Sequence, residues 1–198
     1  MTLTPEQICV LEAIRDEWNR AEGDIKLAEQ VCNEIVFPSI NELRYGGRRV
    51  IDVVHGVLTH APQNDIDGWL ADAKFDCHRA RHDAIDTATS KIAITIENMV
   101  GKLQYEAILP AFPEFPALVN HLGDVRKRIV ESRKGRENRE ALYTAIEGAD
   151  FPSLVDRYRR LLECEPIMRR LALRNRWRDA GAIVAIILGI AALAVAFL

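Results

Sequence analysis

Two histidines and an aspartate with helical spacing are the residues of this sequence that most resemble a metal-binding set. His78, His82 and Asp86 stand at positions i, i+4 and i+8, a spacing that places two imidazoles on one face of a helix. With Ile66 marking the apolar side of that helix, the three residues lie roughly 120–200° around the axis from it. We therefore expect a solvated or partner-facing surface here rather than a metal site, and we expect no cofactor.

An arginine and a histidine lie close together earlier in the chain. Arg49 and His55 are six residues apart, and such a pair could bind a phosphate and transfer a proton. The spacing resembles that of helical-bundle ribonucleases of the HEPN type, although Val50 stands where that family prefers a polar residue. The resemblance implies catalysis by Arg49 and His55. No phosphate-binding glycine loop and no nucleophile elbow occurs in the sequence. These absences favour a non-enzymatic protein and leave catalysis by Arg49 and His55 as an open alternative.

The last 19 residues, 180–198, contain no charged side chain, although 28% of the whole chain is charged. A helix of that length spans about 28 Å, close to the roughly 30 Å hydrocarbon core of a bilayer. Its ten Ile, Leu, Val and Phe residues favour insertion by roughly 3 to 6 kcal/mol, and no charge opposes them. The pattern predicts a C-terminal single-pass transmembrane helix, which makes the protein tail-anchored.

The residues before this span predict its orientation. A basic stalk over residues 166–179 contains Arg169, Arg170, Arg174, Arg176, Trp177 and Arg178. Arginines concentrate on the cytoplasmic side of membranes, and tryptophan is enriched at the interface. We therefore expect the N-terminal domain to be cytoplasmic, with the stalk on anionic headgroups. No signal-peptide pattern precedes the domain.

Small residues recur every four positions within the span, at Gly181, Ala185 and Gly189. This spacing allows two membrane helices to approach closely. An Ala-rich span also produces such a spacing by chance, so self-association and a simple anchor both stay open.

Charge is distributed unevenly along the chain. Residues 1–123 carry 19 acidic and 11 basic residues, whereas residues 124–198 carry 10 and 15. A basic half beside an apolar segment indicates anionic lipid rather than nucleic acid, and no small-molecule ligand is evident. The four cysteines, at positions 9, 32, 77 and 164, form no CxxC pair, so we expect free thiols in a reducing compartment.

Apolar residues repeat with helical periods, and no window alternates as a strand does. We expect helices from Thr4 to about Pro38, from a capping box at Ser39 to before Pro62, and from about Asp65 to Ala107. The third of these has an apolar seam, which consists of Ile66, Leu70, Ala73, Cys77, Ala80, Ala84, Ile92, Ile96, Met99 and Leu103. Three prolines within 109–116 predict a break, followed by a helix near Leu118 and another near Asp150, which Pro166 kinks or restarts. The expected fold is all-α, an antiparallel bundle of about five long helices over residues 1–165, with a heptad, coiled-coil-like seam in the first helix.

Three functions are compatible with these features. The first is a non-enzymatic interaction or sensing module held at the membrane, with a protein partner or a second copy of the chain bound. The second is a membrane-acting effector or toxin triggered through the helical domain. The third is a membrane-tethered ribonuclease or metal-dependent hydrolase that uses Arg49 and His55 or the histidines of the third helix.

Overall fold

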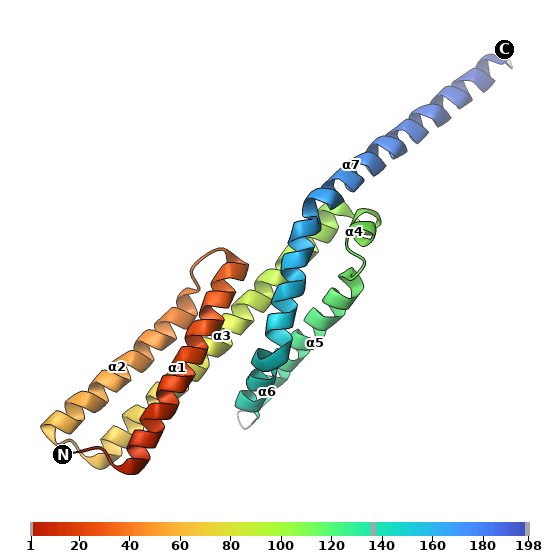
Figure 1. Ribbon diagram of the computed structural model, residues 1–198. Helices are drawn as coiled ribbons and strands as arrows, with labels where there is room; N and C mark the ends of the chain where they lie inside the picture. Colours follow the sequence, from red (N-terminus) through yellow and green to blue (C-terminus); the bar gives the residue numbers. More distant parts are fainter. Residues whose placement is uncertain (1, 136–137, 197–198) are drawn as a thin grey trace. The chain divides into compact units, whose positions relative to one another are not determined.

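The computed structural model describes residues 2–135 and 138–196, with side chains as far as residue 191. All regular secondary structure in these residues is helical, which confirms the all-α prediction (Figure 1). The elements are α1 (Pro5–Cys32), α2 (Phe37–Thr59), α3 (Gln63–Leu103), α4 (Tyr105–Ala111), α5 (Phe115–Lys134), α6 (Arg139–Ala145), a π-helical turn (Ile146–Asp150) and α7 (Phe151–Ala196).

The helices belong to two compact units, which we describe separately. The first unit comprises Met1–Ala93 and Leu122–Ser153, and the second comprises Ile94–His121 and Leu154–Leu198. The first unit therefore contains α1, α2, most of α3, most of α5, α6 and the π-helical turn. The candidate site lies entirely within it.

The ends of the first two helices show how the sequence defines them. Thr4 caps α1, because its hydroxyl accepts a hydrogen bond from the Gln7 backbone N–H at 3.3 Å, and the Thr4 backbone N–H donates to the Gln7 side-chain oxygen at 3.0 Å. The helix ends at Cys32, before a left-handed Asn33, rather than at Pro38. The predicted capping box at Ser39 is wrong, since α2 already begins at Phe37 and Ser39 is buried in its first turn.

Small residues form the packed side of α2. Its buried residues are Ser39, Leu43, Gly46, Val53 and Gly56. A Cβ atom on Gly46 would lie 3.3 Å from the Ala73 carbonyl oxygen, and one on Gly56 would lie 2.6 Å from the Trp69 ring. The two glycines thus let α3 approach α2 closely. Leu43 and Val53 pack on the same side, whereas several other large apolar side chains of α2 are exposed, namely Phe37, Ile51, Val54 and Leu58.

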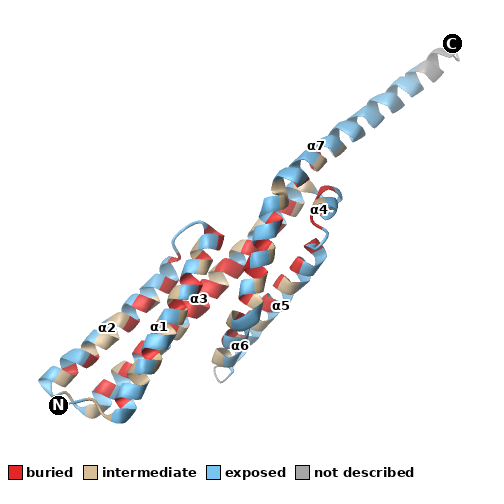
Figure 2. Ribbon diagram, viewed as in Figure 1, coloured by how far each residue is buried: buried red, intermediate tan, exposed pale blue. Residues whose placement is uncertain are grey.

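The apolar seam predicted for α3 is confirmed over most of its length. Its buried members are Ile66, Leu70, Ala73, Cys77, Ala80, Ala84, Ile92, Ile96 and Met99. Arg81, Ile85 and Ala88 are also buried, so more of the helix circumference is covered than the seam alone predicts. Figure 2 shows the buried residues as red bands along α3.

Prolines interrupt the second unit less than their number suggests. Pro110 lies inside α4 and Pro166 lies inside α7, so neither ends its helix. The Tyr105 ring packs edge-on against Phe115 at 5.9 Å, and Arg160 of α7 donates to Glu114 at 3.1 Å. The predicted stalk, residues 166–179, is a continuous part of α7.

The described residues include no helix that is long and apolar enough to cross a membrane. The predicted span 180–198 falls partly outside them, because side chains beyond residue 191 and all of residues 197–198 are not described. Within residues 180–191 the helix continues and every side chain is exposed (Figure 2).

Candidate functional site

A fully buried arginine organises a cluster of charged residues in the first unit. Arg81 of α3 has 0% of its surface exposed. Its guanidinium donates to Glu17 of α1 at 3.0 Å, lies 3.1 Å from Glu147 of the π-helical turn, and donates to Glu140 of α6. A buried charge is tolerated only when it is paired, and here three elements supply the partners. We call Glu17, Arg20, Asp24, His78, Arg81, His82, Glu140 and Glu147 the Arg81 cluster.

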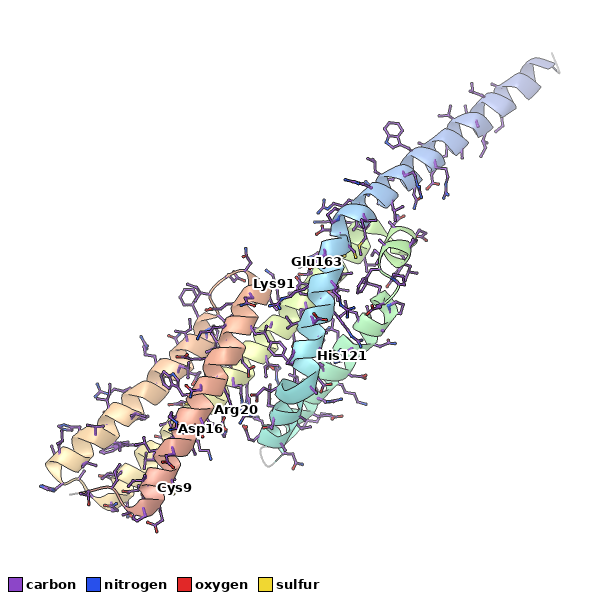
Figure 3. All side chains as sticks on the ribbon, viewed as in Figure 1. Cys9, Asp16, Arg20, Lys91, His121 and Glu163 are labelled. Atoms are coloured by element: carbon purple, nitrogen blue, oxygen red, sulfur yellow. The ribbon has the colours of Figure 1, made fainter. Side chains whose placement is uncertain are left out.

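The α1 side of the Arg81 cluster follows from helical spacing. Glu17, Arg20 and Asp24 are three and four residues apart, so they project from one side of α1. Arg20, labelled in Figure 3, forms two hydrogen bonds to the Glu147 carboxylate, at 2.9 and 2.6 Å, and a third to Glu17 at 2.8 Å. Such two-point pairing fixes the guanidinium geometrically, so it ties the π-helical turn to α1.

Two histidines of α3 face the same carboxylates. His78 Nδ1 lies 3.0 Å from Glu140 Oε2, and His78 Nε2 lies 3.5 Å from Glu17 Oε2. His82 Nε2 lies 3.3 Å from the same Glu140 oxygen. Within the described residues, His78 Nε2, His82 Nε2 and Glu140 Oε2 are buried atoms without a hydrogen-bond partner. The three atoms therefore lie close together without forming hydrogen bonds to one another.

The prediction of a solvated or partner-facing surface is wrong for His82. His82 is buried, and its ring stacks on Tyr143 of α6 with the ring centres 3.7 Å apart. His78, His82 and Asp86 lie away from the apolar seam of α3, as their spacing predicts. The side of α3 that they occupy is nevertheless covered, because α6 packs against it. Asp86, the third member of the predicted set, accepts hydrogen bonds from Tyr143 and Arg133, each at 2.7 Å.

Burial perturbs several titrations in and around the Arg81 cluster. Burial, with a contribution from the Glu147 carboxylate, raises the pKa of Asp24 to about 7. For Glu140 burial acts in the same direction, but the neighbouring imidazoles of His78 and His82 and the Arg81 charge hold its pKa well below the usual range. Burial also raises the pKa of Cys77 to about 11, so that thiol is a poor nucleophile.

Three side chains of the Arg81 cluster are arranged so that they could hold a metal ion. Glu17, His78 and Glu140 each offer one donor atom, and these atoms all lie within 4.8 Å of one another. Of the set predicted from sequence, only His78 belongs to this group. Glu17 and Glu140 were missed because they come from other helices, and only a contact between α1, α3 and α6 brings them to His78.

Arg49 and His55, the pair predicted from the ribonuclease-like spacing, both lie on α2 and outside the Arg81 cluster. Arg49 lies 3.7 Å from Asp52 and 3.5 Å from Asp72, and His55 is exposed. Six residues apart on α2, the two project about 120° from each other around the helix axis. Their shared involvement in a reaction stays a prediction.

The residues predicted to meet a membrane lie along the exposed part of α7. Arg169 pairs with Glu165 at 2.5 Å, and Arg176 donates to the Lys102 carbonyl oxygen at 3.1 Å. The Trp177 side chain is 72% exposed. A Cβ atom on Gly181 or Gly189 would meet nothing within 4 Å, so the small-residue stripe with Ala185 is open.

Comparison with known proteins gives no relative from which a role could be transferred: no family model, curated protein or solved structure matches the chain.

Proposed function

We propose that this protein is a non-enzymatic interaction module held at a membrane by the apolar end of α7. The observation that carries the proposal is the exposure of that segment. Ile183, Val184, Ile186, Ile187, Leu188 and Ile190 are each between 54% and 64% exposed. Because they occupy nearly consecutive positions, they surround the helix. A helix that is apolar on all sides is stable where its surroundings are apolar, as in a bilayer.

The distribution of charged residues around this segment also supports its placement in a bilayer. Five arginines and Trp177 directly precede it, and no charged residue occurs from 180 onward. Arginine near an anionic leaflet contributes about 1 kcal/mol of attraction. The positive-inside rule then orients both helical units toward the cytoplasm.

Liposome flotation tests the anchor. The full-length chain should float with vesicles, whereas a variant with Ile187→Arg and Gly189→Arg should stay in the dense fraction. Each central arginine costs about 2.5 to 3.5 kcal/mol, so two arginines offset the roughly 3 to 6 kcal/mol of favourable insertion. Replacing two exposed residues of another surface, Asn64→Arg and Gly68→Arg, is the matched control. Equal flotation of the two double variants would contradict the anchor.

The exposed face of α2 is the surface that we assign to a protein partner. Phe37, Ile51, Val54 and Leu58 are 56% to 74% exposed, and Ile40 is 39% exposed. Positions 37, 40, 44, 47, 51, 54 and 58 follow the alternation of three and four residues that coiled-coil seams use, and five of these seven are apolar, the exceptions being Arg44 and Gly47. Beside them a groove of about 430 Å³ between α1 and α2 is lined by Trp18, Ile25, Ile40 and Leu43, among others.

The spacing and the charges define the occupant of this face. A heptad seam packs against another helix, and Arg44 and Arg48 lie along the seam of α2. We therefore propose that the partner contributes an amphipathic helix whose apolar seam is flanked by acidic residues.

Photo-crosslinking from α2 in intact cells tests this surface. A photoreactive residue at Leu58 should give a discrete adduct, and Ile51→Lys should abolish it, because a lysine at the centre of the seam places a charge in an apolar contact. The same photoreactive residue at Glu12, on the exposed side of α1, is the control. An adduct with twice the mass of the chain would identify a second copy instead of a partner, and unchanged crosslinking in the Ile51→Lys variant would contradict the proposed face.

A further inference from the structure

The donor atoms within the Arg81 cluster point to a site for a divalent ion. We infer that Glu17, His78 and Glu140 bind a divalent transition-metal ion, such as Zn²⁺ or Mn²⁺, that fastens α6 to α1 and α3. The three donor atoms lie within 4.8 Å of one another. One imidazole nitrogen with two carboxylate oxygens is a donor set that these ions accept.

The contacts at His78 show why a cation fits between these side chains. Both ring nitrogens face carboxylate oxygens, at 3.0 Å toward Glu140 and 3.5 Å toward Glu17. A neutral imidazole has one N–H, so one of these contacts sets a lone pair against a carboxylate oxygen. Metal–ligand bonds of about 2.0 to 2.2 Å place neighbouring donor atoms roughly 3 to 3.5 Å apart, a range that includes the distance from His78 Nδ1 to Glu140 Oε2. An ion at this position would bind His78 through Nδ1 alone, so the present contact of Nε2 with Glu17 is not itself a metal-ligand geometry.

The buried atoms without hydrogen bonds give a second, independent observation. Glu140 Oε2 lies close to His78 and also to His82, which is 9% exposed, yet neither that oxygen nor His82 Nε2 forms a hydrogen bond in the described part of the chain. Unpaired buried polar atoms are costly. An ion bound to Glu140 would satisfy the oxygen.

The formal charges of the Arg81 cluster agree with a divalent ion. Three of its carboxylates, Glu17, Glu140 and Glu147, stand against the two guanidiniums of Arg20 and Arg81. Asp24, whose pKa burial raises to about 7, adds a negative charge only as it ionises. The cluster therefore has an excess of negative charge that a bound cation would offset. Arg81 remains paired in this arrangement, because Glu147 continues to bind it at 3.1 Å.

Metal titration of the full-length protein tests the inference. The chain is purified in mild detergent without a polyhistidine tag, stripped with a chelator, and titrated with Zn²⁺ and separately with Mn²⁺ by calorimetry. We expect one ion per chain and a rise in the melting temperature, because a ligand that binds the folded state stabilises it. His78→Gln should weaken binding by at least about tenfold, by analogy with the 10–100-fold loss caused by changes near metal sites.

Two further variants keep the test decisive. His78→Gln leaves the ion pairs of Arg81 intact, so it should fold, whereas Glu140→Gln removes a ligand that also pairs with Arg81. His55→Gln, an exposed histidine on α2, is the matched control and should bind as the parent chain does. Absence of stoichiometric binding at 1 mM ion, or equal affinity in His78→Gln and His55→Gln, would overturn the site. If NMR showed both His78 nitrogens protonated at pH 8 and no metal were bound, a second proton rather than a metal ion would lie between His78 and the carboxylates, and the metal site would be contradicted.

Discussion

At the level of single residues, Arg81 connects three separate parts of the chain. Its side chain is removed from water and pairs with Glu17, Glu140 and Glu147. Removing one partner of a buried ion pair costs about 3 to 5 kcal/mol, because the other charge stays buried and unpaired. The pairing therefore holds the short α6 and the π-helical turn in one position.

Asp24 gives the first unit a stability that depends on pH. Its folded pKa of about 7 lies above the usual aspartate pKa of 3.8, so between these values the folded state retains a proton that the unfolded state has lost. Stability therefore falls as pH rises through this window, by about 4 kcal/mol in total, since one pKa unit corresponds to about 1.4 kcal/mol. Asp24→Asn has no proton to lose, so its stability relative to the parent should rise from pH 4 to pH 8.

Urea unfolding of the metal-stripped protein at several pH values measures this effect. The control is Asp16→Asn, which changes an exposed carboxylate of α1 and should leave the pH dependence unchanged. A parallel pH dependence for the parent chain and Asp24→Asn would show that another group is responsible.

At the level of elements, α2 depends on its glycines. Gly56→Ala would place a Cβ atom 2.6 Å from the Trp69 ring, and such overpacking costs about 1 to 3 kcal/mol. Gly68→Ala, in a helix with nothing within 4 Å, should instead stabilise the chain by up to about 1 kcal/mol through helix propensity. Thermal unfolding of the two variants should thus show shifts of opposite sign, and equal shifts would mean that α2 and α3 are not in close contact at Gly56.

The comparison of α3 with α2 shows which elements can be predicted from sequence. The seam of α3 was predicted because its apolar residues, alanines included, recur with a helical period from Ile66 to Met99, and these positions are buried. In α2 small residues are buried beside Leu43 and Val53, whereas Ile51 and Leu58 are exposed, so apolar size alone does not identify its packed side.

The Arg81 cluster escaped prediction for a different reason. His78 was identified by its spacing along one helix, but Glu17 and Glu140 lie 61 and 62 positions away in the sequence. One signal was available: Arg81 stands four residues after the buried Cys77 and four before the buried Ile85, a register that places it among core residues. A charge in that register predicts buried partners, although it does not name them.

At the level of the whole molecule, the proposed function depends on the apolar end of α7, and the proposed metal site does not. The metal ligands lie in the first unit, whereas α7 beyond Ser153 belongs to the second. A variant that loses the anchor should therefore still bind a metal ion, and His78→Gln should still associate with membranes. The two proposals can fail separately.

Alkaline carbonate extraction of cell membranes tests the membrane anchor most directly. It removes peripheral proteins and leaves inserted helices in the pellet. We predict that the full-length chain stays in the pellet, and that a chain ending at Asp179 is released because it lacks the apolar segment. The shortened chain should still fold, since residues 180–191 are exposed in the structure. Complete release of the full-length chain would contradict the account, since the apolar end of α7 would then lie outside the bilayer.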